Sequence, residues 1–434
     1  MASEETPTMA PPPTAETPVR EEKTAPRAWA VRLVTVGIVL AALNLRPAIT
    51  SLGALLEEVR DGLGMSGGVA GLLTSVPPLC FAIFGVMAPR LAKRFGASAV
   101  VCAGMAAITA GLIIRPYTGN TVGFLVASAL ALMGIAVSNV LMPVIVKRWF
   151  PDRVGSMTGV YSMALAAGTS LAAAATVPMT DALGGSWQTG LAVWAALGAA
   201  AVLPWIPLVR EKGPAPAAPV TRSATADADG DGLRITRSRT AWALAVFFGL
   251  QATAAYITMG WMAQIFRDSG VSASTAGLLL AVTMVMGVPL GFVIPRVAAR
   301  LPSQGPMVIA LGVCGLAGYA GLYLAPASGA WAWAILLGIS NCAFPLALTM
   351  VGMRARTGAG VVKLSAFAQS TGYLISIPGP LLVGVLYEAT DGWGVPIALM
   401  ATLMVPQIVI GVLAGRNRTV EDEATVAPEG APAS

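Results

Sequence analysis

Arg46 is the residue whose type and position point most directly to chemistry. It stands directly before Pro47, inside an otherwise apolar run that extends from Leu33 to Leu56. An arginine at mid-bilayer costs about 2.5–3.5 kcal/mol on insertion scales, so it is rarely retained without a polar task. Its planar guanidinium carries a fixed positive charge and suits an anionic or carbonyl-bearing solute. The alternative is a structural arginine, satisfied by backbone carbonyls and asparagine side chains of neighbouring helices.

The residues around Arg46 favour an open, uncompensated site. Pro47 removes a backbone donor and should kink the helix, which opens backbone groups toward a cavity. The next acidic residue, Glu57, follows 11 residues later, which is about 16 Å along a helix. Asn44 is only two residues from Arg46 and points in another direction, but we include it among the candidate solute contacts.

Other polar side chains within apolar segments are candidates for binding a compact polar solute. Asn139 and Asn341 each stand four residues before a proline that interrupts the helix. These amides either face a shared cavity or join helices through hydrogen bonds. The remaining candidates are two further amides and two phenols: Gln251, Gln369, Tyr161 and Tyr256. The two glutamines are favoured because an idle buried amide costs more than an idle hydroxyl, although packing remains the competing interpretation for each.

The sequence argues against several other kinds of site. It has no histidine, and its four cysteines lack metal-ligand spacing, so we expect no metal, no cofactor and no catalytic residue. Residues 227–232 copy half of a calcium loop, but Ser238 stands where the bidentate glutamate is needed. Carboxylates avoid the predicted membrane core. In a proton-coupled mechanism, the proton would therefore be carried by Glu57 or Glu388 near one mouth, or by the solute itself. The absence of carboxylates from the core favours uniport or exchange.

The elements that position these side chains are predicted to be membrane helices. The chain is 56% hydrophobic and only 11% charged, whereas a soluble domain carries about 25% charged residues. Charge-free stretches recur from 62–89 to 392–415, and each reaches the roughly 20 residues that span a bilayer. The stretch 301–353 holds two helices separated by a turn at 326–329. With the Arg46 segment, the prediction is an all-α integral membrane protein with twelve transmembrane helices.

The basic residues indicate the orientation. All but four of the 27 lysines and arginines fall on the side of the two termini, so we expect both termini in the cytoplasm of a cell-membrane protein. The other four are Arg46 and three residues on the opposite side, Arg60, Arg115 and Arg267. This distribution explains the net charge of +6 without a nucleic-acid partner. Apart from the lipid bilayer and a small solute we expect no partner, and we expect a monomer.

The chain divides into two similar halves. We expect six-helix bundles at 29–209 and 241–416, a cytoplasmic linker at 210–240, and disordered cytoplasmic tails at 1–28 and 417–434. Matching positions in the halves carry the same residues: Arg90 and Arg94 with Arg296 and Arg300, Asn139 with Asn341, and Trp187 with Trp393. Parallel repeats of this kind place a binding site near mid-membrane, between the bundles.

Residues 29–416 resemble the major facilitator superfamily. The turn 85–94 is similar to the signature between helices 2 and 3 of that family, except that Pro89 replaces the usual aspartate and Ala92 the second glycine. The resemblance implies a gating role for the turn arginines Arg90, Arg94, Arg296 and Arg300. The departure at Pro89 removes the charge contact normally attributed to that aspartate.

The first helix narrows the resemblance. Residues 43–48 (LNLRPA) and 50–53 (TSLG) are similar to the opening of the cyanate porter and 2-nitroimidazole permease branch. The resemblance implies a secondary active or facilitative transporter that moves a small polar or anionic solute by alternating access. The alternatives are an efflux carrier for small heterocyclic compounds and, more remotely, a non-transporting membrane sensor or scaffold. An integral membrane enzyme is disfavoured because no nucleophile, acid pair or metal cluster is apparent.

Overall fold

The described part of the protein is all-helical, as predicted. The structure, a computed structural model, describes residues 28–209 and 235–425, and every regular element within these ranges is a helix. The predictions for residues 1–27, 210–234 and 426–434 lie outside the described residues. These ranges cover most of the predicted first tail, most of the predicted linker and the calcium-like run at 227–232.

The first half contains ten α-helices and two short 3₁₀ turns. The α-helices are α1 (Ala28–Asn44), α2 (Pro47–Ala54), α3 (Leu56–Leu63), α4 (Gly67–Phe95), α5 (Ala97–Ile114), α6 (Thr121–Trp149), α7 (Val154–Ala182), α8 (Trp187–Ala192), α9 (Trp194–Val202) and α10 (Trp205–Leu208). The 3₁₀ turns are η1 (Arg115–Tyr117) and η2 (Pro151–Arg153).

The second half begins with the 3₁₀ turn η3 (Ile235–Arg237). Its α-helices are α12 (Arg239–Asp268), α13 (Ala273–Val285), α14 (Gly287–Arg300), α15 (Gly305–Leu324), α16 (Ala330–Asn341), α17 (Ala343–Met353), α18 (Gly358–Ser376), α19 (Pro378–Thr390), α20 (Gly394–Ala414) and α21 (Val420–Thr425).

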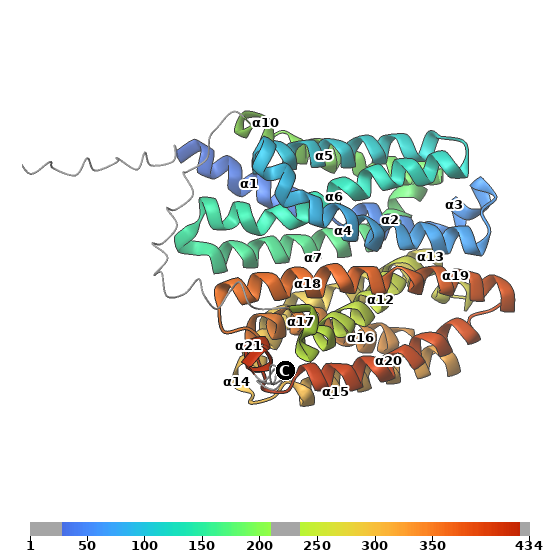
Figure 1. The fold of residues 1–434 in the computed structure, drawn as a ribbon. Coiled ribbons are helices and arrows are strands. Elements are labelled where there is room, and N and C mark those ends of the chain that lie inside the picture. Colours follow the sequence, from blue (N-terminus) through green and yellow to red (C-terminus); the bar gives the residue numbers. More distant parts are fainter. Residues whose placement is uncertain (1–27, 210–234, 426–434) are drawn as a thin grey trace, which may run out of the picture.

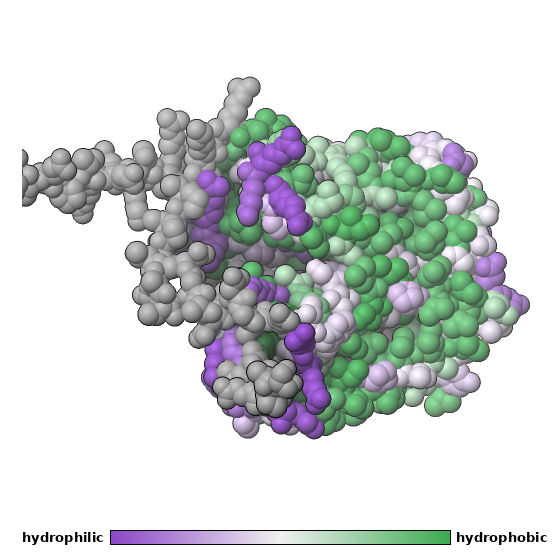
Figure 2. All heavy atoms as spheres, in the orientation of Figure 1, coloured by the Kyte–Doolittle hydropathy of each residue, from purple (hydrophilic) through white to green (hydrophobic). Residues whose placement is uncertain are grey.

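These helices are consistent with twelve spans. Eleven stretches of the described chain are long and apolar enough to cross a membrane. The remaining span is the shorter apolar stretch Trp187–Val202, which α10 continues to Leu208. Figure 2 shows apolar residues over most of the drawn face and hydrophilic residues gathered mainly at one end. This surface suits a protein surrounded by lipid.

Prolines break several spans near their middle. The kink predicted at Pro47 is present: α1 ends at Asn44 and α2 begins at Pro47. The tenth span is divided into α16 and α17 at Cys342, three residues before Pro345. A proline lacks the N–H that would bond the carbonyl four residues earlier. These breaks therefore expose backbone acceptors within the bundle, away from water.

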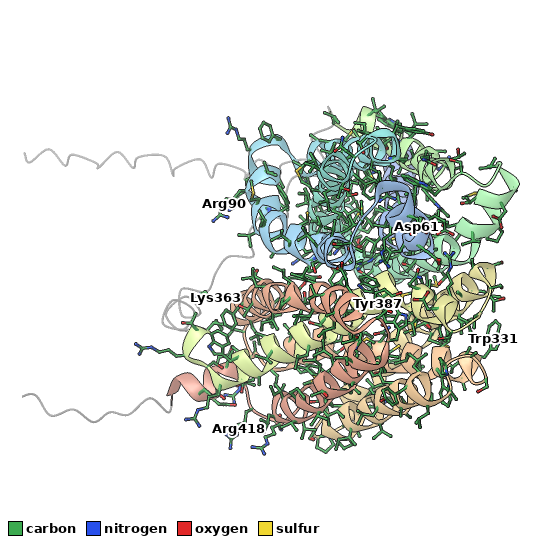
Figure 3. The ribbon with its side chains drawn as sticks, turned by 90° about the vertical axis from the view of Figure 1, so that its right-hand side faces the viewer. Asp61, Arg90, Trp331, Lys363, Tyr387 and Arg418 are labelled. Carbon is green, nitrogen blue, oxygen red and sulfur yellow. The ribbon has the colours of Figure 1, made fainter. Side chains whose placement is uncertain are left out.

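The two halves form two bundles that lie side by side (Figure 1). Across the interface, α2 packs on α12, α7 on α13, and α4 on both α18 and α19. We call the end at which α1 begins and α21 lies the terminal end, and the end that carries α3 the far end (Figure 1). Arg90, Lys363 and Arg418 project away from the helices, whereas Tyr387 lies where the bundles meet (Figure 3).

The far end is tied together by a set of polar contacts that we call the far-end latch: Glu57 and Glu58 of α3 with Arg267 of α12, and Gly68 of α4 with Glu388 of α19. Arg267 forms ion pairs of 2.9 Å with both Glu57 and Glu58. The Gly68 N–H donates to Glu388 Oε2 at 2.9 Å. The latch joins the first half to the second half at this end.

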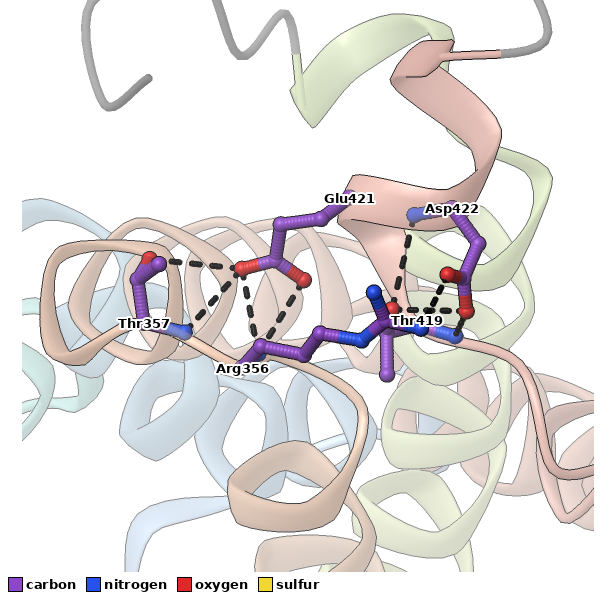
Figure 4. A network of polar contacts seen from close by, with 5 residues as sticks. All are labelled: Arg356, Thr357, Thr419, Glu421 and Asp422. Atoms are coloured by element: carbon purple, nitrogen blue, oxygen red, sulfur yellow. Dashed lines mark hydrogen bonds and ion pairs between the residues drawn. The ribbon is translucent and has the colours of Figure 1, made fainter. Parts of the chain in front are cut away.

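The prediction of a disordered tail at 417–434 is wrong for residues 420–425, which form α21. Figure 4 shows how this helix is held: Glu421 accepts from the backbone N–H groups of Arg356 and Thr357. Glu423 accepts from the Ser238 and Thr240 hydroxyls, each at 2.7 Å. Both carboxylates therefore lie at helix N-termini, those of α18 and α12, where negative charge is favoured.

Candidate functional site

Arg46 lies at the break between α1 and α2, where no regular helix fixes its backbone. Its φ of −120° and ψ of −28° fall outside the α-helical geometry of the flanking residues. The side chain is half-buried, and its Cζ lies 5.9 Å from the centroid of the Phe81 ring on α4. The guanidinium therefore faces an aromatic ring. Within the described chain, the ion pairs between side chains involve Arg267 and Arg356 and do not include Arg46.

Three tyrosines, one from the first bundle and two from the second, lie within electrostatic range of this guanidinium. The positive charge of Arg46 acts on the hydroxyls of Tyr161 on α7, Tyr256 on α12 and Tyr373 on α18. Tyr373 also stacks on Phe81, with ring centroids 5.1 Å apart.

We call Arg46, Phe81, Tyr161, Tyr256 and Tyr373 the Arg46 cluster. One of its members, Phe81, was not among the residues that the sequence offered as solute contacts. The whole set combines one fixed positive charge with three phenols and a flat aromatic face. It can therefore hold an anion or a polar ring through charge, hydroxyl hydrogen bonds and stacking.

The predicted asparagine pair is placed in two different settings. Asn139 on α6 is linked to the Arg46 cluster, because its Oδ1 accepts a 2.6 Å hydrogen bond from the Tyr161 hydroxyl. Asn341, at the end of α16, is linked instead to Gln251 on α12, whose Nε2 donates to the Asn341 backbone carbonyl at 3.5 Å. Pro345 leaves this carbonyl without its helical donor, and Gln251 takes that place.

Gln251 and Asn341 retain unused polar atoms. Gln251 Oε1 and Asn341 Nδ2 are buried and have no hydrogen-bond partner. Buried amides without partners are rare in native proteins. This pair is therefore available to a solute or to water.

Gln369 and Asn44 are the predicted residues least engaged with the cluster. Gln369 lies one helical turn before Tyr373 on α18 and donates to Ser365 Oγ at 2.7 Å. Asn44 is fully buried inside the first bundle, where its Nδ2 approaches Met105 Sδ at 3.7 Å. The structure thus sets Asn44 apart from Arg46, and we withdraw it as a solute contact.

The four predicted gating arginines lie at the terminal end. Arg90 and Arg296 each donate to a carbonyl of their own helix, those of Val86 and Phe292. Arg94 lies over the Phe95 ring, with its Cζ 5.2 Å from the centroid, and Arg300 is exposed at the end of α14. Arg90, Arg94 and Arg296 thus contact residues that are close to them in the sequence.

The structure contains a second polar centre that the sequence analysis did not predict. The far-end latch continues into a network around Asp268, which accepts from Gln264, Tyr387 and Trp393. Arg267 was expected only as a charge on the side opposite the termini, and its neighbour Asp268 was assigned no role. Hydropathy places them at a helix end, but no one-dimensional pattern indicates that α3, α12 and α19 meet there.

No metal centre is apparent in the part of the chain that the structure describes. Groups of three or more histidine, cysteine, aspartate or glutamate side chains with metal-binding geometry do not occur among these residues. The described cysteines are all free thiols.

Comparison with protein families gives a match over most of the chain. The model of the Major Facilitator Superfamily matches residues 34–361. The 2-nitroimidazole transporter of Escherichia coli is 32% identical over 394 residues, which are 90% of this chain and 97% of that protein. The cyanate transport protein CynX of Escherichia coli is 28% identical over 374 residues, 86% of this chain and 94% of that protein.

Solved structures show the same fold at lower identity. The nucleoside transporter NupG is 14% identical, with a TM-score of 0.71 over 89% of this chain and 98% of that one. A bacterial homologue of the human lysosomal transporter Spinster, in an inward-facing and occupied conformation, is 15% identical. It has a TM-score of 0.70 over 92% of this chain and 97% of that one.

Proposed function

Since this chain belongs to the major facilitator superfamily and is a multi-pass membrane transporter of a small solute rather than an enzyme, we propose that its solute is a compact polar or anionic molecule bound by Arg46. The observation that carries the proposal is the Arg46 cluster. One guanidinium outside the ion pairs of the described chain lies at the interface of the bundles, among three tyrosine hydroxyls from α7, α12 and α18.

The chemistry of the cluster supports a flat, compact solute. Arg46 supplies planar donors for a carboxylate, a nitro group or a linear anion. Tyr161 and Tyr256 supply hydroxyls, and the stacked pair Phe81 and Tyr373 supplies aromatic surface. Relatives at 28–32% identity are transporters of cyanate and of 2-nitroimidazole, and both are small planar or linear molecules.

We place the terminal end on the cytoplasmic side of the cell membrane, and we expect the protein to be a monomer. The asymmetry of basic residues supports this orientation. The far-end latch then closes the extracytoplasmic side, and Figure 2 shows the molecule hollowed between the bundles at the terminal end. This arrangement corresponds to the state in which the Arg46 cluster is reached from the cytoplasm. Release of the latch and closure of the terminal end give the opposite state.

A second candidate is an efflux carrier for small heterocyclic compounds. The aromatic side chains of Phe81 and Tyr373 favour it, because a flat heterocycle packs well against aromatic rings. The same site serves both functions, and they differ in the solute and in the direction of movement.

Transport by purified protein in liposomes tests the proposal. We predict that Arg46→Ala lowers uptake of the transported solute, from a panel with cyanate, other small anions and 2-nitroimidazole, by about 10- to 100-fold. This corresponds to the loss of one or two hydrogen bonds to a charged group. Arg46→Lys should also impair transport, because a point charge does not replace the planar donor pair.

Arg418→Ala is the matched control, because Arg418 is an exposed arginine at the terminal end, and its uptake should equal that of the unmodified protein. Equal uptake by the Arg46→Ala variant would remove Arg46 as the solute contact. Near-normal kinetics for Arg46→Lys would show that charge alone is sufficient.

A further inference from the structure

Arg115 is a second arginine enclosed within the helices, and it is far more deeply buried than Arg46. Its side chain is 2% exposed, and it lies in η1 at the end of the span Ala97–Tyr117. Within the described chain, none of the ion pairs reaches it. Moving an uncompensated charge out of water costs several kcal/mol even after relaxation. The groups that stabilise the charge of Arg115 must therefore be identified.

Neutral groups satisfy only part of this guanidinium. Nη1 donates to the Ala48 carbonyl at 2.9 Å, and Nη2 reaches Ser51 Oγ at 3.5 Å. Cζ lies 5.9 Å from the Phe124 ring centroid. The Nε–H is buried and has no partner. An arginine carries five N–H donors, so most of the donor capacity of Arg115 is unused.

Arg354 shows what a structurally satisfied arginine looks like in this protein. It is 1% exposed, and its Nε donates to the Ala414 carbonyl at 3.1 Å. Its Nη2 donates to the Gly415 carbonyl at 2.8 Å and also to Gln304 Oε1. These groups close the end of α20. Arg115 has no comparable set of acceptors.

A cavity lies beside Arg115. It is small and is lined by residues of α2, α4, η1, α6 and α12, including Thr74, Arg115, Ser128 and Tyr256. Ser128 is 1% exposed, and its Oγ has no hydrogen-bond partner. Arg115 is the only charged residue among those that line the cavity. A positive group and a hydroxyl without a hydrogen-bond partner thus line the same cavity.

We propose that this cavity is a second binding site, for a compact monovalent anion such as a halide or cyanate, held by Arg115 and Ser128. The anion supplies the countercharge that the described residues do not provide. Tyr256 lines this cavity and also interacts electrostatically with Arg46, so it is common to the surroundings of both arginines. The inference does not depend on the transported solute being an anion.

The walls of the cavity come from both bundles, which couples occupancy to conformation. At Gly53 of α2, the Met259 carbonyl of α12 occupies the place of a Cβ. At Gly260 of α12, a Cβ would lie 2.7 Å from Thr74 Cγ2 of α4. Separation of the bundles at the far end would open this space. The bound anion therefore stabilises the state in which the far end is closed.

Anion binding by purified protein in lipid nanodiscs tests the site. The background is Arg46→Gln, which removes the central guanidinium. Sodium chloride or sodium cyanate is titrated against sodium gluconate at constant ionic strength, and the thermal unfolding midpoint is followed. We predict that the midpoint rises with anion concentration and reaches a plateau, and that Arg115→Gln abolishes this rise. Ser128→Ala should raise the apparent Kd of the anion about tenfold, because it removes one hydrogen bond to a charged group. A response to chloride identifies a resident halide, and a response to cyanate alone identifies a solute-like anion.

Ser75→Ala is the matched control, because Ser75 also has a buried, unpartnered hydroxyl but does not line the cavity. If Arg115→Gln does not fold, the comparison of Ser128→Ala with Ser75→Ala decides. Equal responses of these two variants, or no anion response in the Arg46→Gln background, would overturn the site. A retained anion response together with unchanged transport by Arg46→Gln would instead refute the proposed function and leave this site intact.

Discussion

Three buried or half-buried arginines have different surroundings, which assign them different tasks. Arg354 is surrounded by carbonyl and amide oxygens and closes the end of α20. Arg115 lines a small cavity and has N–H donors without partners. Arg46 lies among hydroxyls of both bundles. A guanidinium cannot release its proton in a protein, so each charge must be met by acceptors, a ligand or water.

Tyr256 provides a prediction at this scale, because its hydroxyl is close to Arg46 and its side chain is 4% exposed. Tyr256→Phe keeps the ring and removes one hydrogen bond to the solute. We expect the KM of transport to rise about fivefold to tenfold, as for a net loss of roughly 1–1.5 kcal/mol. Kinetics of uptake into liposomes measure it.

Tyr319→Phe is the control for this substitution, since Tyr319 is equally buried but lies on α15, outside the Arg46 cluster. Its KM should stay within about twofold of that of the unmodified protein, the scale of a small free-energy change. A KM for Tyr256→Phe that matches the control would exclude the Tyr256 hydroxyl from solute binding.

At the scale of elements, broken helices bring polar backbone into the membrane interior. The break at Pro47 places Arg46 outside regular helix, and the break before Pro345 offers the Asn341 carbonyl to Gln251. Non-helical backbone at membrane depth is tolerated only where protein or a water-filled cavity covers it. The breaks therefore lie where a binding site is expected between the bundles.

Helix α21 is the element whose stability depends most clearly on pH. Partial burial raises the pKa of the Glu421 carboxyl, but the backbone N–H groups of Arg356 and Thr357 outweigh burial and hold that pKa below its ordinary value of 4.5. For Glu423, the donors are Ser238 and Thr240, and the net direction is the same. Docking of α21 is thus fully stabilised above pH 4.5 and loses this stabilisation as the pH falls through the lowered pKa values.

Amide hydrogen exchange at neutral pH checks this account. Glu421→Gln and Glu423→Gln mimic the protonated side chains, and we expect faster exchange of the amides at 419–423 in both variants. Asp391→Asn, at an exposed turn of the far end, should leave exchange in this segment unchanged. A spin label at Arg418 should become more mobile only below pH 4.5, and constant mobility down to pH 3 would contradict the assignment.

At the scale of the whole molecule, the two bundles are joined across the far end by ion pairs and by close backbone contact. At Gly71 and Gly384, the opposite backbone lies too close for any side chain. Small residues of this kind let membrane helices approach closely. The interface can therefore separate and re-form as two rigid surfaces, which is what alternating access requires.

The sequence predicted the class, the spans and the special position of Arg46, because charge and hydropathy are readable along one chain. Phe81 and Tyr373 were not predicted as partners of Arg46, because hydropathy does not show which faces of α4 and α18 meet. Arg115 was read as a turn residue because it stands at a helix end before Pro116. The acidic run 421–423 was read as part of a tail, since only docking against α12 and α18 stabilises α21.

The most direct test of the central claim is the reactivity of a Tyr161→Cys variant, which keeps Arg46 and whose native cysteines are replaced by alanine. Membrane-impermeant thiol reagents are applied to each face of oriented liposomes, with and without saturating solute. We predict that the thiol reacts with reagent applied to the cytoplasmic face. Its reaction rate should fall about tenfold when the solute concentration is ten times its Kd, because solute then fills most of the sites. A thiol that does not react from either face, or whose rate solute does not alter, would contradict a solute site at Arg46.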